Sequence, residues 1–263
     1  MRLRLFLCVL ALSCIGWAGT FDQPLSKKVV DLGRSESSPG RRAKVTCYFF
    51  PHFMVKEVDL GEKGSDRLAI VPVVKGKPTK CTKSQDPVEK VVKADDWAGY
   101  FKGVKGNFVF FDADDGMNSG MPFAVYDAES GKKLFEDNAL GPLAFTALPD
   151  KTVQVNYRRV VSAGCPLPKD QSCWKSTKAK LGLDNASAPD CAAGYEKNVT
   201  TLARGYCQSH VKDHASCLAT ETKRRREELK DDPSVLSFPV SVTLGVNPEI
   251  KPTVGELRCW PAD

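Results

Sequence analysis

The segment VLSFPVSVTLGV, residues 235–246, constrains the fold more than any other part of the chain. Every second residue is apolar: Leu236, Phe238, Val240, Val242, Leu244 and Val246. A period of two puts these side chains on one face of a β-strand, whereas a helix would spread them around its circumference. We therefore expect a long strand here with one buried face.

Shorter segments of the same kind lie before residue 164. Strand-like alternation or apolar runs occur at residues 45–49, 68–74, 107–111, 123–126 and 152–161, with turn residues between them. Such a succession predicts an antiparallel, sandwich-like β domain. We assign residues 43–164 plus 233–263 to it. Residues 19–42, rich in Ser, Gly and charge, predict a flexible N-terminal arm.

Residues 165–232 lack the strand-like runs of the other segments and predict a cysteine-rich helical insertion. The overall class is therefore α+β, with a mainly β body. Tyr195, Val199, Leu202 and Tyr206 are separated by steps of four, three and four. This spacing puts them on one helix face. Val211, His214 and Leu218 continue the steps, which predicts one helix that ends before Pro233.

The first residues have the pattern of a secretory signal peptide. Arg2 and Arg4 precede an apolar run that ends at Ala18, with Gly16 and Ala18 at the −3 and −1 positions of a cut. We expect residues 1–18 to be removed and the product to be secreted or periplasmic. No later segment reaches the roughly 20 apolar residues that span a bilayer, so the mature chain is expected to lack a transmembrane segment.

Eight cysteines follow this leader: Cys47, Cys81, Cys165, Cys173, Cys191, Cys207, Cys217 and Cys259. An even number in an oxidising compartment predicts four disulfide bonds, although the pairing does not follow from the sequence. Within one straight helix, Cys207 and Cys217 would lie about 15 Å apart, which excludes a bond between them. The formal charge of +6 is spread over the chain, which argues against nucleic acid as a partner.

The stretch FDADDGMNSGMPFAVYD, residues 111–127, leaves two interpretations open. Its oxygen-bearing residues Asp112, Asp114, Asp115 and Asn118 could hold calcium as a cofactor. Against this, Gly116 occupies the fifth position of an EF-hand count, where a ligand is needed, and Phe123 occupies the twelfth, where Glu is needed. We favour a hairpin turn, because Asp, Asn and Gly are common turn residues.

The segment CQSHVKDHASC contains a second candidate metal site. His210 and His214 have the i, i+4 spacing that lets two imidazoles share one metal on a helix. The Glu of the HExxH motif is missing, however, and disulfide formation by Cys207 and Cys217 is favoured over metal binding. Asn185 and Asn198 begin N-glycosylation sequons in the same insertion.

The sequence contains no GxSxG elbow, P-loop or Gly-rich dinucleotide turn. We therefore predict an exported, disulfide-stabilised binding or interaction protein rather than an enzyme. Its partner would be an extracellular or periplasmic protein or a small ligand. The alternative is a secreted hydrolase that uses a metal on His210 and His214, or acidic residues such as Asp95 and Asp96.

Overall fold

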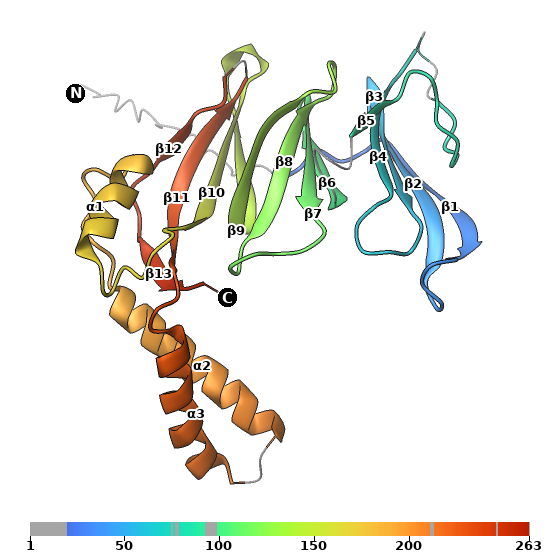
Figure 1. Ribbon diagram of the computed structural model, residues 1–263. Coiled ribbons are helices and arrows are strands. Elements are labelled where there is room, and N and C mark those ends of the chain that lie inside the picture. The colour runs from blue at the N-terminus through green and yellow to red at the C-terminus, as the bar shows by residue number, and fades with distance from the viewer. Residues whose placement is uncertain are drawn as a thin grey trace, which may run out of the picture.

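The computed structural model of the chain describes residues 20–74, 76, 79–92, 99–210, 213–245 and 247–262. The expected signal peptide with its Ala18 cleavage site, Asp95, Asp96 and Val246 lie outside these residues. Within them the fold is mainly antiparallel β with three α-helices, which confirms the predicted class (Figure 1). No helix in the described ranges is long and apolar enough to cross a membrane.

The first half of the chain forms a five-stranded antiparallel sheet, in the order β1-β2-β3-β4-β5. Its strands are β1 (Ser26–Arg34), β2 (Arg42–Phe49), β3 (Phe53–Asp59), β4 (Arg67–Pro72) and β5 (Lys90–Val92). Strand β1 corrects the predicted flexible arm, because it pairs with β2 along its length. The arm is anchored because Val30 and Leu32 pack against the buried side chains of this sheet, while charged residues take the exposed positions.

The second sheet has eight strands, in the order β12-β11-β10-β9-β8-β7-β6, with β13 paired to β11. Its strands are β6 (Gly99–Lys105), β7 (Phe108–Ala113), β8 (Met121–Asp127), β9 (Lys133–Ala147), β10 (Val153–Ser162), β11 (Ser234–Leu244), β12 (Ile250–Pro252) and β13 (Arg258–Pro261). A short 3-10 turn, Pro149–Lys151, links β9 to β10. The predicted strand at residues 235–246 is β11. Both of its faces are covered rather than one, since Val235 and Ser237, on the other face, are also fully buried.

Strand β7 shows how the two sheets share the core. Phe108 and Phe110 join a cluster with side chains of β8 to β11, so the large sheet curls around that cluster. Val109 and Phe111, on the opposite face, pack against Val55 and other residues of the five-stranded sheet. This double burial explains why β7 is a continuous apolar run, since each face needs hydrophobic side chains.

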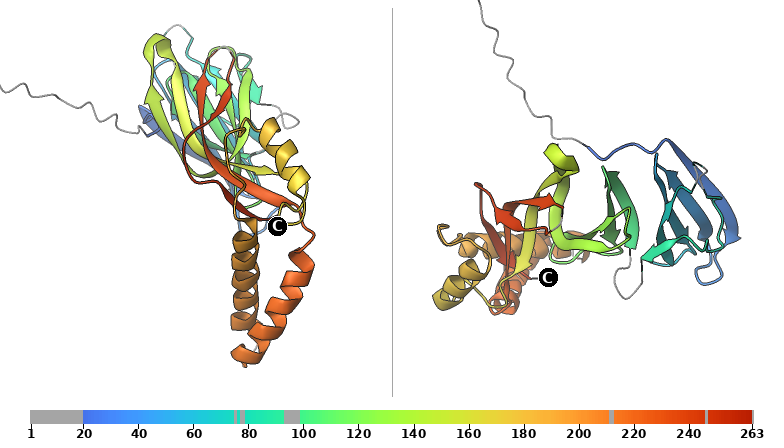
Figure 2. Two further views of the ribbon diagram at one scale, coloured as in Figure 1. Left: turned by 90° about the vertical axis from the view of Figure 1, so that its left-hand side faces the viewer. Right: turned by 90° about the horizontal axis from the view of Figure 1, so that it is seen from above.

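The helices lie between β10 and β11, which are direct neighbours in the large sheet. They are α1 (Gln171–Lys180), α2 (Cys191–His210) and α3 (His214–Leu229). Helices α2 and α3 form a hairpin that projects from the β body (Figures 1 and 2). Its base is fixed by Tyr195, whose hydroxyl donates to the Asp232 carbonyl oxygen at 2.7 Å.

Candidate functional site

The loop between β7 and β8 closes a hairpin, as predicted. Met117 and Gly120 exchange two backbone hydrogen bonds of 2.9 Å each. The two residues between them, Asn118 and Ser119, have φ angles of 52° and 65°. Positive φ at both central positions is the geometry of a type I′ turn, the tight connection that matches the twist of paired strands.

The carboxylates of this loop engage separate lysines. Asp112 Oδ1 lies 2.5 Å from Lys102 Nζ, and Asp115 forms an ion pair with Lys63. The Lys63 ammonium lowers the pKa of Asp115. Among the described residues, no three His, Cys, Asp or Glu side chains are grouped to hold one metal ion.

Calcium binding by Asp112, Asp114, Asp115 and Asn118 stays a prediction. Thermal unfolding in millimolar calcium and in a chelator tests it, because a ligand bound only to the native state raises the midpoint. Equal midpoints would contradict it.

The helix that should carry His210 and His214 is not continuous, so the premise of the histidine pair is wrong. His210 ends α2 and His214 begins α3. The His210 ring stacks on Tyr206, with ring centroids 4.7 Å apart. A new helix begins here because the Asp213 carboxylate accepts the Ser216 backbone N–H and caps α3.

The eight cysteines form four disulfide bonds, as predicted. The pairs are Cys47–Cys81, Cys165–Cys173, Cys191–Cys259 and Cys207–Cys217. The exclusion of a Cys207–Cys217 bond is wrong, because it assumed one straight helix. Because α2 and α3 form a hairpin, the Cα atoms of Cys207 and Cys217 lie only 5.9 Å apart. Four disulfides fit a protein of an extracellular or periplasmic compartment.

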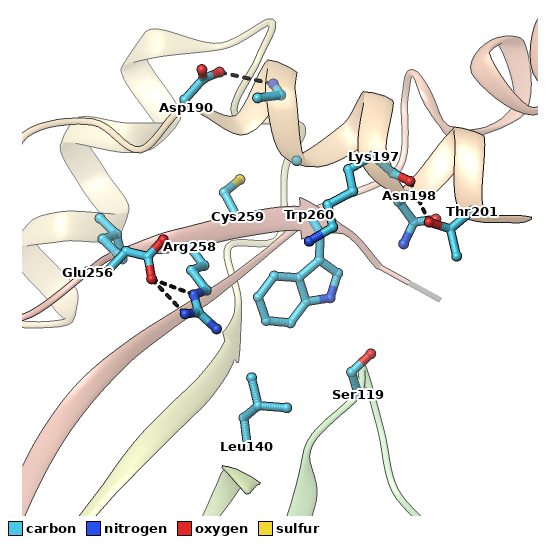
Figure 3. Close-up of a pocket in the computed structure, with 13 residues that line it drawn as sticks. Ser119, Leu140, Asp190, Lys197, Asn198, Thr201, Glu256, Arg258, Cys259 and Trp260 are labelled. Carbon is cyan, nitrogen blue, oxygen red and sulfur yellow. Dashed lines mark hydrogen bonds and ion pairs between the residues drawn. The ribbon is translucent and has the colours of Figure 1, made fainter.

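A concavity that we call the α2–β13 groove lies where the helical hairpin meets the β body (Figure 3). Its volume is about 720 Å³, within the range of about 300–1,000 Å³ typical of small-molecule sites. Its walls come from four separate parts of the chain. They are Ser119 of the type I′ turn, Leu140 of β9, six residues of 190–201 at and after the start of α2, and residues 256–260.

The groove is held rigidly on the α2 side. The Cys191–Cys259 disulfide joins the first residue of α2 to β13. One turn later, Gly194 passes so close to β13 that a Cβ atom there would lie 1.8 Å from the Cys259 carbonyl oxygen. Any larger residue would therefore push the helix away from the strand, which explains the glycine.

Two polar atoms at the groove are buried without a hydrogen-bond partner in the described structure. They are the indole Nε1 of Trp260, a donor, and the amide Oδ1 of Asn198, an acceptor. Leaving such a group unpaired costs about 1–3 kcal/mol. Figure 3 shows the Trp260 indole at the centre of the groove with Asn198 beside it. Both side chains line the groove, but the two unpaired atoms are covered by protein, so a ligand reaches them only when a side chain shifts.

Three charged residues at one end of the groove, Arg158, Glu256 and Arg258, contact one another. Arg258 Nε donates to Glu256 Oε2 at 2.7 Å, and Arg158 of β10 donates to the Glu256 backbone carbonyl at 2.9 Å. Burial, together with the nearby Arg258, lowers the pKa of Arg158. At the other end, the Asp190 carboxylate accepts the Ala193 backbone N–H at 3.0 Å, at the start of α2.

None of the residues predicted from the sequence as metal ligands lines this groove. Asn198 was noticed only as a sequon, and it proves to be half-buried in the groove, whereas Asn185 is exposed on the loop before α2. The groove is assembled from segments that lie up to about 140 residues apart, and no local pattern in the sequence joins them. No protein-family model, curated protein or solved structure is significantly similar to the chain.

Proposed function

We propose that this is an exported binding protein that takes a small polar ligand in the α2–β13 groove, after removal of the predicted leader at Ala18. The observation that carries the proposal is the pair of unpartnered buried atoms, Trp260 Nε1 and Asn198 Oδ1, in residues that line this groove. Functional pockets commonly combine apolar walls with a few converging polar groups. Ligand hydroxyl groups suit both kinds of atom, because each hydroxyl donates and accepts.

Binding is supported over hydrolysis by the state of the groove carboxylates. Asp190 caps the N-terminus of α2, and Glu256 pairs with Arg258. A hydrolytic acid–base pair needs carboxylates that are free to exchange protons with a substrate. These two are committed to structural contacts instead.

The groove can be blocked without disturbing the core. Ala193 is exposed and lines the groove, whereas its neighbour Ala192 is exposed and lines a different concavity, on another side of α2. Replacing Ala193 with Phe should fill the groove, and Ala192→Phe is the matched control.

The test is a titration of the ¹⁵N-labelled protein with glucose, glucuronate, benzyl alcohol and benzoate, followed at the Trp260 indole N–H resonance. We expect at least one compound to shift this resonance, Ala193→Phe to abolish the shift, and Ala192→Phe to retain it. The indole resonance of Trp174, which is partly buried against a separate core cluster, should stay constant. A Trp260 resonance that no compound moves would refute the proposal.

A further inference from the structure

The charges around the α2–β13 groove do not balance. Arg158, Lys197 and Arg258 stand against only two carboxylates, Asp190 and Glu256. Both arginines share Glu256, since Arg158 Nη2 lies 3.9 Å and Arg258 Nη2 lies 2.7 Å from its Oε2. The groove and its rim therefore hold one positive charge more than their own carboxylates neutralise.

Because the groove has fewer carboxylates than cations, one cation lacks a partner among the described residues, and that cation is Lys197. Within the part of the chain that the structure describes, no carboxylate forms an ion pair with its ammonium group. Asp190, the other acid of the groove, faces the start of α2, where the helix dipole already favours a negative charge. A ligand carboxylate would be the natural partner for Lys197.

The cations flank an aromatic ring. Figure 3 shows the Trp260 indole between the side chains of Lys197 and Arg258. Trp260 follows Arg258 by two residues in β13, so both project from the same face of the strand. An indole has an apolar body and one N–H donor, which suits a ring with C–H groups on its face and acceptors at its edge.

From these three features we infer that the groove binds an acidic sugar, that is, a hydroxylated ring with a carboxylate. The inference rests on the proposed function of the groove as a binding site. The carboxylate would pair with Lys197 and Arg258, the C–H face would lie on Trp260, and a ring hydroxyl would donate to Asn198 Oδ1.

Three probes with the same ring and different charge test the carboxylate: glucuronate, glucose and glucosamine, titrated against the Trp260 indole N–H resonance. Charge-assisted hydrogen bonds are about twice as strong as neutral ones, so we expect the Kd of glucuronate to be about tenfold lower than that of glucose. Glucosamine should bind most weakly. Glucose or glucosamine binding as tightly as glucuronate would overturn the inference but leave the groove as a binding site. If none of the three sugars moves the resonance, the inference fails, whereas the proposed binding function fails only if benzyl alcohol and benzoate also leave it unchanged.

Benzoate tests the hydroxyls, because it has a ring and a carboxylate but no donor for Asn198. We expect it to bind more weakly than glucuronate. Equal affinity would overturn the assignment to a sugar.

The cation is tested by Lys197→Met, which removes the charge and keeps the apolar stem of the side chain. We expect a loss of about tenfold in glucuronate affinity and no change for glucose. Lys223→Met, on the exposed surface of α3, is the control and should bind glucuronate like the parent. Raising sodium chloride from 20 to 500 mM should weaken the binding of glucuronate but not that of glucose, since salt screens exposed charges. Unchanged affinity in Lys197→Met would overturn the role of this residue.

A free sugar acid and an acidic polysaccharide share this chemistry, and chain length separates them. If a trimer of galacturonate binds more tightly than the monomer, the ligand of the groove is an acidic polysaccharide. Equal affinity per molecule assigns it to the free acid. A trimer that cannot enter also indicates the free acid.

Discussion

Pairs of opposite charge occur in both the five-stranded sheet and the helical hairpin, but they differ in burial. In the sheet, the side chains of Lys56 and Glu89 are 1% and 0% exposed, and they contact each other in the interior. On the hairpin, Arg226 and Glu196 join α3 to α2 across the surface, with both side chains about half exposed. Loss of one partner should therefore destabilise the sheet strongly and the hairpin only slightly, because solvent screens the surface pair and not the buried one.

The largest effect should come from breaking the buried pair. Lys56→Met leaves the Glu89 carboxylate without its main partner and removes the hydrogen bond to the Ser84 carbonyl. We expect a loss of about 3–5 kcal/mol in the free energy of unfolding, measured with urea. Lys56→Met combined with Glu89→Leu should recover most of that loss. A single variant as stable as the parent would mean that burial does not set the difference between the regions.

Removal of the hairpin disulfide comes next. The Cys207–Cys217 bond closes a loop of only 10 residues, so replacing both with Ser should cost about 2–3 kcal/mol. We expect this cost to be local, because α2 and α3 project from the body and share few buried side chains. Amide hydrogen exchange should accelerate in α2 and α3 and stay constant in β7 and β10. Equal acceleration in the strands would show that hairpin and body unfold together.

A third charge tests whether the body tolerates a buried acid that forms no ion pair in the described structure. Glu57 of β3 is buried, and its Oε2 accepts the Phe101 backbone N–H of β6 at 2.8 Å. Burial raises its pKa, although this hydrogen bond opposes the shift. The native state therefore holds the Glu57 proton more tightly than the unfolded state does. Its contribution to stability is largest in acid and falls as the pH rises from the ordinary carboxyl value through the raised one.

Glu57→Gln should abolish that pH dependence while keeping an acceptor for Phe101. Relative to the parent, we expect the variant to gain stability between pH 4 and pH 7, measured as urea midpoints at several pH values. A stability difference that does not change with pH would contradict the raised pKa.

The smallest effect should come from the surface pair. Arg226→Gln removes the ion pair between α3 and α2, and we expect the urea midpoint of unfolding to stay within error of the parent value. A clear loss of stability would show that the hairpin depends on its surface charges as much as the sheet depends on Lys56.

The strands were predictable because their signals are local. The alternation from Leu236 to Leu244 and the turn residues before Met121 identified β11 and the β7–β8 hairpin from the sequence. The break between α2 and α3 was missed, although it had a signal. Asp213 three residues before Ser216 is a typical N-cap, but the apolar steps through Val211 concealed it. Strand β1 was missed because its exposed lysines resemble a solvated arm.

The groove was beyond prediction for a different reason. Ser119, Leu140, Asn198 and Trp260 belong to four elements, and only the tertiary fold brings them together. Neither hydrophobic periodicity nor motif spacing contains that information. The unpaired Trp260 and Asn198 atoms are visible only when each buried polar group is checked for a partner.

The length of α2 has a consequence for how the disulfides form during biosynthesis. Cys191 leaves the ribosome 68 residues before its partner Cys259, and Cys207 and Cys217 appear in between as competing thiols. Once α2 is helical, the 16 residues from Cys191 to Cys207 separate them by about 24 Å, far beyond disulfide reach. The helix thus acts as a spacer that keeps an early cysteine from the wrong neighbour until β13 arrives.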